Sequence, residues 1–429
     1  MQTLIKDLPG HVGQELTVRC WMYNKRSSKT LHFLQLRDGS GVIQGVVAQN
    51  EVPPAAWDLA AQLTMESAVA VTGVVRDDKR SPTGVELTVK DLQLLQMSQE
   101  YPISKKEHGI DFLLDHRHLW LRSRRQRSIL KIRASIIRAC RGFLDGEGFT
   151  LVDAPIFTPN ACEGTTTLFE TEYFGSKAYL TQSGQLYNEA AAMALGKVYC
   201  FGPTFRAEKS KTRRHLTEFW MIEPEMAFHD WQDNIAVQEQ FVSHVVRTVL
   251  AECAADFQVL ERDIEPLKHV EPPFPRLSYT QAVELLQKAG RDFKWGDDFG
   301  AEDETVISEQ HDRPVFVYQY PAAVKAFYMK ANPEDPRVVL CNDLLAPEGY
   351  GEIIGAGQRE DSLETLQAKI AEHGLPQKNF EWYLDLRRYG SVPHSGFGMG
   401  IERMVSWLCK LEHVREAIPF PRTIYRNTP

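Results

Sequence analysis

The sequence predicts two unlike domains, a small β-barrel at the front of the chain and a larger α+β domain behind it. Residues 1–97 contain short runs that alternate apolar and polar side chains, whereas residues 117–429 alternate helical and strand patterns. The chain has 429 residues, of which 43% are hydrophobic and 25% are charged. This composition is ordinary for a globular protein with a sizeable core, and it excludes a disordered, collagen-like or coiled-coil chain.

The front domain is expected to hold five strands and one helix. The strands are predicted at residues 15–23, 30–38, 41–47, 67–75 and 85–95, and the helix at residues 51–64. Asp38-Gly39 and Ser81-Pro82 have the residue types that favour turns. Five strands with a helix between the third and the fourth is the order of an oligonucleotide-binding (OB) barrel.

Two side chains of this barrel are candidates for contacts with a nucleic acid. Phe33 and Gln44 fall on neighbouring central strands, where an aromatic ring can stack on a base and an amide can read its edge. The pattern leaves a second interpretation open, in which Phe33 belongs to the barrel core and Gln44 is an ordinary surface residue.

Positive charge is concentrated at the front of the chain. The whole chain has a formal charge of −8, which argues against a nonspecific nucleic-acid binder. Residues 1–141, however, contain 21 Lys and Arg residues and only 14 Asp and Glu residues. Within this part of the chain, the polar residues 98–116 are expected to form a hinge. The stretch 117–141 has nine Lys or Arg residues and no acid. This asymmetry favours contact with a polyanion, although Ile129, Ile132 and Ile136 at helical spacing also fit a solvated amphipathic helix.

Cysteine content and hydropathy predict a cytoplasmic protein. The seven cysteines are an odd number without a CxxC pair, so we expect neither a zinc site nor a disulfide scaffold. No run of eighteen apolar residues occurs, and the first residues have no apolar block. We therefore expect no membrane-spanning helix and no signal peptide.

Three stretches of the larger domain carry its chemistry. They are 146–159, a helix end followed by a strand; 205–228, a basic loop between two strand-like ends; and 396–408, a Gly-rich turn that enters a helix. Arg206 and Arg403 lie in apolar surroundings, where a charge needs an anionic partner. Two partners remain open, a buried carboxylate or a triphosphate, which guanidinium groups bind well.

Together these stretches resemble a known family. The segments FRAE with RHLTEF, GFGMGIER and the upstream GF…P resemble motifs 2, 3 and 1 of the class II aminoacyl-tRNA synthetases. The OB-type front resembles the aspartyl, asparaginyl and lysyl subgroup, and residues 101–123, 180–225 and 346–359 resemble its bacterial asparaginyl members. The resemblance spans essentially the whole chain. It implies a catalytic domain built on an antiparallel sheet flanked by helices, and an anticodon-binding barrel.

The resemblance also implies an activity and partners. A bacterial asparaginyl member activates L-asparagine with ATP, releases pyrophosphate and transfers the amino acid to the 3′ end of tRNA(Asn). The resemblance to motif 1 further implies a twofold-symmetric homodimer, with residues 146–159 and the preceding helix at the interface and Pro155 at its edge. In the barrel, Phe33 would stack on the central anticodon base and Gln44 would read its edge.

Residue by residue, the resemblance implies an ATP site with Mg²⁺. Arg206 would bind the α-phosphate and act with Arg403 as a catalytic residue. The other nucleotide contacts would come from Glu208 on the adenine amino group, Phe219 on the ring, Arg214 and His215 at the γ-phosphate, Arg403 on the other adenine face and γ-phosphate, and Gly398 and Gly400, which let the nucleotide approach the backbone. Glu352 and Asp343 match the carboxylates that hold Mg²⁺, and Gly355 stands where aspartyl members often have serine.

The amino-acid site is expected to distinguish asparagine from aspartate by charge. Glu163, in the lid-like segment 158–169, and Gln185 match residues that hold the α-ammonium group, while Arg359 and Glu223 would donate to and accept from the side-chain amide. Aspartyl relatives carry a lysine in a QSPQLYKQ-type segment, and here QSGQLYNE has Asn188 instead. Asparagine is therefore favoured. The main alternative is a non-discriminating aspartyl-tRNA synthetase; an asparagine-synthetase-like paralogue and a non-catalytic RNA-binding regulator are more distant ones.

Overall fold

The computed structural model describes residues 3–81, 83–159, 161–162 and 167–429. It divides into two compact units, Met1–Ile110 and Asp111–Pro429, and the division falls inside the polar segment 98–116. Each unit has its own hydrophobic core, so each is described by itself. The predicted turn residue Pro82 and the predicted ligand Glu163 lie outside the described residues.

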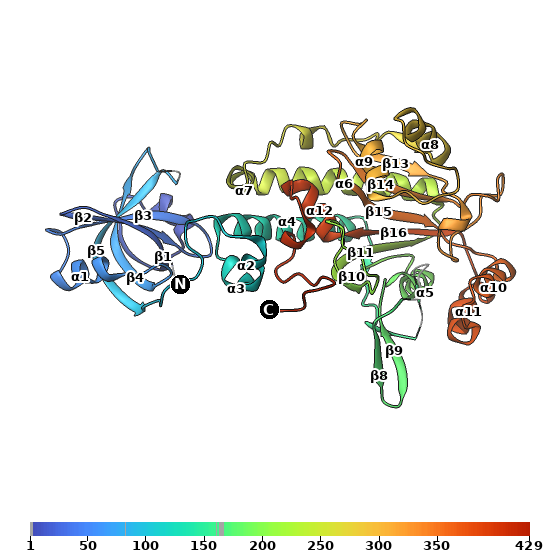
Figure 1. Cartoon of the computed structure of the whole chain (residues 1–429), viewed down its shortest axis with the longest axis horizontal. Coiled ribbons are helices and arrows are strands. Elements are labelled where there is room, and N and C mark those ends of the chain that lie inside the picture. The colour runs from blue at the N-terminus through green and yellow to red at the C-terminus, as the bar shows by residue number, and fades with distance from the viewer. Residues whose placement is uncertain (1–2, 82, 160, 163–166) are drawn as a thin grey trace. The chain divides into compact units, whose positions relative to one another are not determined.

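The first unit is a closed five-stranded barrel, as the sequence predicts (Figure 1). Its strand order is β1-β2-β3-β5-β4. The elements are β1 (Glu15–Ser27), β2 (Leu31–Arg37), β3 (Val42–Ala48), α1 (Pro54–Gln62), β4 (Ala68–Asp77) and β5 (Val85–Gln96), with a 3-10 helix at Ile5–His11 that the sequence pattern does not predict. Alternate side chains such as Val18, Leu34 and Val71 are fully buried inside the barrel, which is the period-2 burial that the alternating pattern predicts.

The alternation also places the two predicted anticodon residues. In β2 and β3 the even-numbered residue Leu34 and the odd-numbered residue Val47 are fully buried, while Phe33 and Gln44 are half-buried on the opposite, outer face. Gln35 pairs directly with Gln44 across the two strands, and Phe33 lies two residues before Gln35 on the same face. Phe33 is therefore not a residue of the barrel core.

The second unit is built on an eight-stranded sheet with the order β12-β13-β14-β15-β16-β11-β10-β6. The strands are β6 (Thr150–Leu151), β10 (Lys197–Phe205), β11 (Glu218–Ala227), β12 (Arg276–Ser278), β13 (Val315–Tyr318), β14 (Cys341–Ala346), β15 (Gly351–Gln358) and β16 (His394–Gly400). The predicted antiparallel sheet is confirmed from β13 to β10, and parallel pairs, β12 with β13 and β6 with β10, extend it at both ends.

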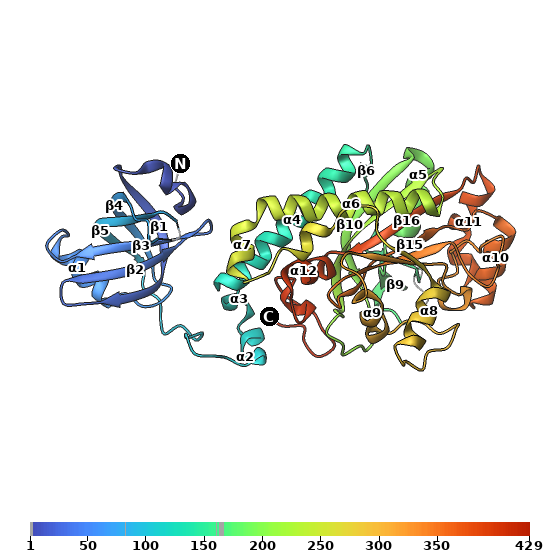
Figure 2. The same ribbon diagram turned by 90° about the horizontal axis from the view of Figure 1, so that it is seen from above.

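Helices flank this sheet and bury its apolar side chains. The helices are α2 (Ile110–Asp115), α3 (Arg117–Trp120), α4 (Arg124–Gly146), α5 (Gln185–Leu195), α6 (Trp231–Glu252), α7 (Ala254–Val259), α8 (Tyr279–Lys288), α9 (Ala301–Ser308), α10 (Leu363–Glu372), α11 (Glu381–Arg388) and α12 (Ile401–Cys409). Helices α4 and α6 lie side by side in both ribbon views (Figures 1 and 2). Their buried residues, among them Ile132, Val242 and Phe241, form one core with Met404 of α12. Within the described residues, no helix combines the length and the apolar character needed to cross a membrane.

A small sheet of β7 (Phe157–Thr158), β9 (Ser176–Leu180) and β8 (Glu170–Tyr173) adds a hairpin that projects from this unit in Figure 1. Close to it in sequence, Leu151, Ile156 and Phe157 are exposed apolar side chains, 40%, 42% and 52% accessible. Because β6 is the last strand of the large sheet, its outer edge has no neighbouring strand among the described residues. An exposed edge beside exposed apolar side chains is typical of a surface that another chain covers.

The basic stretch 117–141 has a mixed role in the structure. Arg117 is fully buried; its Nε donates to the carbonyl oxygen of Pro419 and its NH2 to that of Ile418, both at 2.8 Å. Arg133 is buried in an ion pair of 2.7 Å with Glu402. Residues 1–97 carry ten Lys and Arg residues and ten Asp and Glu. The positive excess of the front of the chain therefore lies beyond the barrel, and part of it holds the second unit together.

Candidate active site

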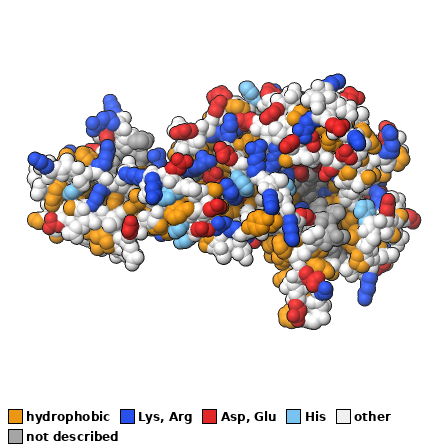
Figure 3. All heavy atoms as spheres, in the orientation of Figure 1, with side chains coloured by type: hydrophobic (Ala, Val, Ile, Leu, Met, Phe, Trp, Pro, Cys, Tyr) orange, Lys and Arg blue, Asp and Glu red, His pale blue; other side chains and the backbone are white. Residues whose placement is uncertain are grey.

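The residues predicted to bind ATP line a single cavity. The cavity has a volume of about 340 Å³ and lies over strands β10, β11, β15 and β16 of the large sheet. Its walls include Arg206, Glu208, Arg214, His215, Phe219, Glu352, Gly398, Gly400 and Arg403. In Figure 3 the visible face of this unit is hollowed near its middle, with Lys and Arg side chains at the margin. Residues as far apart in sequence as Arg206 and Arg403 thus meet in one site.

The two arginines that sequence analysis singles out have different protein partners. NH1 of Arg403, in the first turn of α12, donates to both the carboxylate and the backbone oxygen of Glu352 at 2.8 Å. Arg206, at the end of β10, donates to the backbone carbonyl of Gln182, and its guanidinium carbon lies 5.7 Å from the centre of the Phe219 ring. The Glu352 carboxylate thus accepts directly from Arg403, and the charge of Arg206 also helps to lower the pKa of Glu352, after burial, which raises it, and after Arg403 and Lys325.

Arg214 is held by a set of acceptors that the sequence does not reveal. Its NH1 donates to Glu304 of α9 at 2.8 Å, and its NH2 donates to Thr305 Oγ1 and the carbonyl of Gly349, both at 2.6 Å. Burial, and to a lesser extent the nearby Glu352 carboxylate, raises the pKa of Glu304 to about 7. Gly351 has a φ of +69°, and a Cβ there would collide with this ion pair, so the chain needs glycine at that position.

The two predicted Mg²⁺ ligands lie on adjacent strands and face the same space. Asp343 of β14 is paired in register with Gly355 of β15. A Cβ built on Gly355 would lie 3.1 Å from Glu352 Oε1 and 3.7 Å from Asp343 Oδ1. The other Asp343 oxygen accepts from Lys325 at 2.7 Å. The missing side chain thus leaves a small cradle bounded by two carboxylate oxygens, and hard oxygen donors around such a space fit Mg²⁺.

Lys325 is a member of the site that sequence analysis misses. It follows the apolar run YPAAV, a setting in which a lysine is costly unless it is paired. Burial alone would lower its pKa, but the Asp343 carboxylate raises the pKa of Lys325 above its ordinary value. Its ammonium group also lies 3.9 Å from the centre of the Tyr320 ring. Lys325 therefore stays charged beside the predicted metal ligands.

A second cavity, of about 420 Å³, adjoins the first and contains the described residues of the predicted amino-acid site. Gln185, Glu223 and Arg359 line it, and Arg206 and Glu352 line both cavities. The Glu223 carboxylate accepts from the Ser183 hydroxyl and from the backbone N–H of Gly184 at 2.9 Å. Because the two cavities share Arg206, a ligand in one can reach a ligand in the other at that residue.

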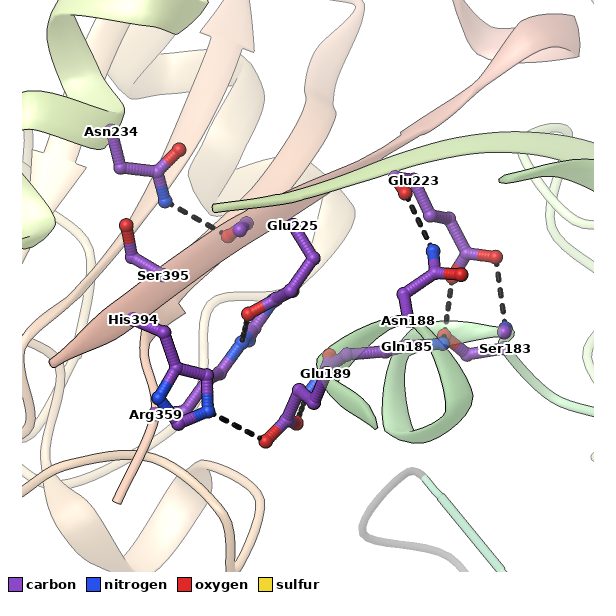
Figure 4. Close-up of polar contacts among 12 residues, drawn as sticks. Ser183, Gln185, Asn188, Glu189, Glu223, Glu225, Asn234, Arg359, His394 and Ser395 are labelled. Atoms are coloured by element: carbon purple, nitrogen blue, oxygen red, sulfur yellow. Dashed lines mark hydrogen bonds and ion pairs between the residues drawn. The ribbon is translucent and has the colours of Figure 1, made fainter. Parts of the chain in front are cut away.

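Arg359 has a buried partner that sequence analysis does not identify. Its Nε and NH2 donate to the two carboxylate oxygens of Glu225 at 3.0 and 2.9 Å (Figure 4). Burial alone would lower the pKa of Arg359, but Glu225 raises it above the usual range of arginine. The guanidinium carries more N–H groups than this pair uses, so Arg359 can remain bound to Glu225 and still donate to a ligand.

Asn188, which replaces the lysine of aspartyl relatives, lies behind strand β11. It is buried in α5, and its Nδ2 donates to the backbone oxygen of Glu223 at 2.7 Å and to Cys200 Sγ at 3.2 Å. Asn188 is not among the residues that line the amino-acid cavity. Asn188 therefore supports the backbone of strand β11. Compared with a lysine, it removes a positive charge and adds no side chain to the wall of the amino-acid cavity.

The charges that line the amino-acid cavity favour a substrate with a neutral side chain. The carboxylates are Glu223, Glu225, Asp343 and Glu352, and the permanent cations are Arg206, Lys325 and Arg359. Glu225, Asp343 and Glu352 are offset by ion pairs with Arg359, Lys325 and Arg403. The Glu223 carboxylate accepts from the Ser183 hydroxyl and the Gly184 N–H, so it can also accept from a substrate amide and would repel a second carboxylate. The cavity thus suits an amide better than an acid.

Family models match both units of the chain. A model described as tRNA synthetases class II (D, K and N) matches residues 109–424, and one described as OB-fold nucleic acid binding domain matches residues 16–95. A protein of Desulforamulus reducens named Asparagine--tRNA ligase is 60% identical over 427 residues, covering 100% of this chain and 99% of that protein. One of the same name from Pelotomaculum thermopropionicum is 58% identical, and both chains are covered at 100%.

Solved structures agree with this match over the full length. The crystal structure of asparaginyl-tRNA synthetase from Pyrococcus horikoshii, complexed with asparaginyl-adenylate, has a TM-score of 0.97 and 46% identity, with 100% of both chains covered. The asparaginyl-tRNA synthetase of Entamoeba histolytica in complex with asparaginyl-adenylate has a TM-score of 0.90 and 31% identity, again with 100% of both chains covered.

Proposed function

Because the chain belongs to the class II tRNA synthetases of the D, K and N group, we propose that it joins L-asparagine to tRNA(Asn) in two steps. ATP and asparagine first form asparaginyl-adenylate and pyrophosphate, and the asparaginyl group then passes to the 3′ end of the tRNA. One observation carries this proposal: a nucleotide cavity and an amino-acid cavity with Glu223 in its wall meet at Arg206 and Glu352. Relatives named Asparagine--tRNA ligase, 55–60% identical over 99–100% of this chain, support it.

Activation requires little proton chemistry from the protein. The substrate carboxylate is ionised at neutral pH, so it attacks the α-phosphorus without a general base. Arg206 lies where the two cavities join, and its guanidinium would neutralise the charge that builds on the α-phosphate. Arg214 and His215 would hold the γ-phosphate, and Arg403 would cover the adenine. Catalysis then rests on position and charge.

The adenine is proposed to lie between two side chains and to be read by a third. Phe219 would stack on one face of the ring and Arg403 on the other, while the Glu208 carboxylate accepts from the adenine amino group. Gly398 and Gly400 are in the strand below, where the missing side chains let the nucleotide come close to the backbone. The same cavity contains all five residues.

Glu352 and Asp343 would hold Mg²⁺ at the phosphates. The cradle above Gly355, bounded by Glu352 Oε1 and Asp343 Oδ1, supports this role. A bound Mg²⁺ neutralises phosphate charge and favours departure of pyrophosphate. Lys325 and Arg403 hold the two carboxylates in place through their other oxygens.

In the amino-acid cavity, Gln185 would bind the α-ammonium group, and Arg359 and Glu223 would bind the side-chain amide. Glu163, outside the described residues, would be the second ligand of the α-ammonium group. The Glu223 carboxylate in the wall of this cavity supports asparagine and argues against a non-discriminating aspartyl enzyme, which also has to accept a second carboxylate. A pocket that hydrogen-bonds its substrate can reject a competitor strongly when polar or charged groups are left unmatched.

The remaining partners and the assembly are part of the same proposal. Residues 1–97 would bind the anticodon of tRNA(Asn) through Phe33 and Gln44, residues 98–116 would act as the hinge, and residues 117–429 would carry the catalysis. The exposed edge around β6 and residues 146–159 supports a homodimer. All seven cysteines are free and buried, which suits a reducing cytoplasm.

The test is a comparison of substrates in both half-reactions. ATP–pyrophosphate exchange should depend on asparagine and be at least about a hundredfold weaker with aspartate at equal concentration, as expected for a polar site that rejects a mismatched charge. Charging should then occur on a tRNA(Asn) transcript and not on a tRNA(Asp) transcript. Equal exchange with both amino acids, together with charging of both transcripts, would identify the non-discriminating enzyme instead.

A further inference from the structure

A buried carboxylate lies behind the amino-acid cavity and is not part of its wall. Glu189 of α5 is completely buried, and its oxygens accept from Arg387 NH2 at 2.7 Å, from His394 Nε2 at 2.9 Å and from the Tyr383 hydroxyl at 2.8 Å. Burial alone would raise its pKa, but Arg387 and His394 hold the pKa of Glu189 well below its usual range. The group is therefore a fixed negative charge.

Glu189 also contacts the proposed substrate-binding residues. One turn earlier on α5, Gln185 Nε2 donates to Glu189 at 3.1 Å, and Gln185 lines the amino-acid cavity. On the other side, the backbone N–H of Arg359 donates to the carbonyl of His394 at 2.9 Å, while Arg387 Nε donates to the carbonyl of Glu360 at 2.8 Å. Glu189 thus connects Gln185 of α5 to His394 of β16, whose backbone carbonyl accepts from Arg359 (Figure 4).

The charges of this cluster are balanced without a metal ion. Ligand atoms of Glu189, Glu225 and His394 lie within 4.8 Å of one another, close enough to consider a cation site. The guanidinium groups of Arg387 and Arg359, however, already pair with the two carboxylates. The cluster is therefore an ion-pair network. Arg359 pairs directly with Glu225, and its charge also interacts with that of Glu189.

We infer that Glu189 is a positioning and specificity-determining residue for the reaction proposed above, on which this inference rests. It holds Gln185 in place to bind the α-ammonium group. Its negative charge also offsets the positive charge of Arg359. The guanidinium can then donate to an amide, while the site has no net positive charge that would attract a second carboxylate. Asparagine is thereby accepted and aspartate rejected by a residue that touches neither.

The test uses Glu189→Gln and measures exchange with asparagine and with aspartate. The asparagine-over-aspartate ratio of kcat/KM should fall about tenfold or more, the scale of one buried charge interaction. The KM for asparagine should rise and the KM for ATP should stay as in the parent. Glu239→Gln is the matched control, because Glu239 is also a buried carboxylate paired with an arginine, Arg276, but lines neither cavity.

A second variant covers the case in which Glu189→Gln does not fold. Glu189→Asp keeps the charge but shortens the side chain, so aspartate should be rejected as in the parent while the KM for asparagine rises several-fold. The inference is overturned if folded Glu189→Gln keeps the parent's ratio, or if Glu189→Asp leaves the KM for asparagine unchanged. A parent protein that activates neither amino acid, or both equally, would instead contradict the proposed function itself.

Discussion

Arg214 and Glu304 form an ion pair of 2.8 Å in the wall of the nucleotide cavity, and the same Glu304 oxygen also accepts from the backbone N–H of Glu352 at 3.1 Å. One carboxylate thus connects a proposed γ-phosphate ligand to a proposed Mg²⁺ ligand. It comes from α9, a helix with none of the motif residues. The pair fixes where the guanidinium of Arg214 points before any nucleotide binds.

Glu304→Gln should therefore weaken nucleotide binding selectively. Loss of one charged partner from Arg214 is expected to raise the KM for ATP about tenfold, since a hydrogen bond to a charged group contributes about 1.5–3 kcal/mol. The KM for asparagine should change little. Pyrophosphate exchange at varied ATP measures both, with Glu302→Gln as the control, because Glu302 is on the same helix but its side chain is 83% exposed. Equal changes in both KM values would refute a role specific to ATP.

Arg206→Ala should abolish activation and spare the fold. The side chain donates to a backbone carbonyl, and the Glu352 carboxylate, whose pKa Arg206 helps to lower, keeps its ion pair of 2.8 Å with Arg403 when Arg206 is removed. Exchange should fall by about a thousandfold, the upper range for one lost transition-state donor, while the melting temperature and tRNA binding stay close to the parent. Arg337→Ala, which removes a 73% exposed arginine paired with Asp335, should keep full exchange. Substantial ATP–pyrophosphate exchange by Arg206→Ala would contradict the proposed role of Arg206 in activation.

Phe33→Ala should separate the two half-reactions. The ring lies on the outer face of the barrel, and loss of one stacked base costs about 1–3 kcal/mol. Charging of tRNA(Asn) should therefore fall about ten- to a hundredfold, with pyrophosphate exchange untouched. Leu95→Ala, at an apolar side chain of β5 that is 56% exposed, is the control.

A transcript altered at the central anticodon base makes the Phe33 comparison decisive. The parent should prefer the unaltered transcript, and Phe33→Ala should lose most of that preference. If folded Phe33→Ala discriminates between the two transcripts as strongly as the parent, Phe33 does not read the anticodon.

Leu151→Asp combined with Phe157→Asp should produce an inactive monomer. Both side chains are exposed and apolar, next to the free edge of β6, and a carboxylate buried in a subunit interface is costly. Light scattering should show half the parent mass, with exchange lost at the same concentrations. Leu94→Asp, at a 43% exposed leucine of the barrel, should remain dimeric. A stable, active monomer of the parent at working concentration would end the dimer proposal.

His413 should make the fold weaker as the pH falls below neutrality. Burial, and to a lesser extent the positive charge of Arg415, lowers the pKa of His413 from its ordinary 6.5 to about 4. A lowered folded-state pKa means that the stability is fully present above about 6.5 and is lost as the pH falls toward 4. Since the side chain is only half-buried, the expected contribution is about 1–2 kcal/mol after screening.

The variant His413→Asn isolates this effect. Nδ1 of His413 accepts from the backbone N–H of Arg415 at 3.1 Å, and the asparagine oxygen can replace it as a cap without titrating. Denaturant unfolding at pH 7 and pH 4 should show a larger loss for the parent than for the variant. Parallel losses would show that His413 is not the titrating group.

Sequence patterns predict best where the physical signal is local. The barrel strands follow from alternation over five to ten residues, and the nucleotide residues follow from three motifs whose members are close in the chain. Gly398 and Arg403, for instance, are five residues apart. Alternation is a short-range signal that a single sequence displays directly, whereas the nucleotide roles, that of Glu352 outside the three motifs included, are implied by the resemblance to the family.

The charged partners of these residues could not be predicted because they come from distant parts of the chain. Arg359 and Glu225 are 134 residues apart, and Arg387 and Glu189 are 198 apart. The sequence around each of these residues does not identify its partner, since any acidic residue can pair with any arginine. The sequence likewise does not reveal the partner of Asn188, which donates to the backbone of β11 and does not line the amino-acid cavity.

The buried contacts of Arg117 with the carbonyls of Pro419 and Ile418 have a consequence for how the protein emerges from the ribosome. One of the first side chains of the catalytic unit finds its acceptors 302 residues later, so this contact forms only after nearly the whole chain has been synthesised. The barrel has a separate core within its own residues, and domains generally fold as units, N-terminal first. During translation a folded barrel is therefore followed by a catalytic unit whose assembly waits for residues 418 and 419.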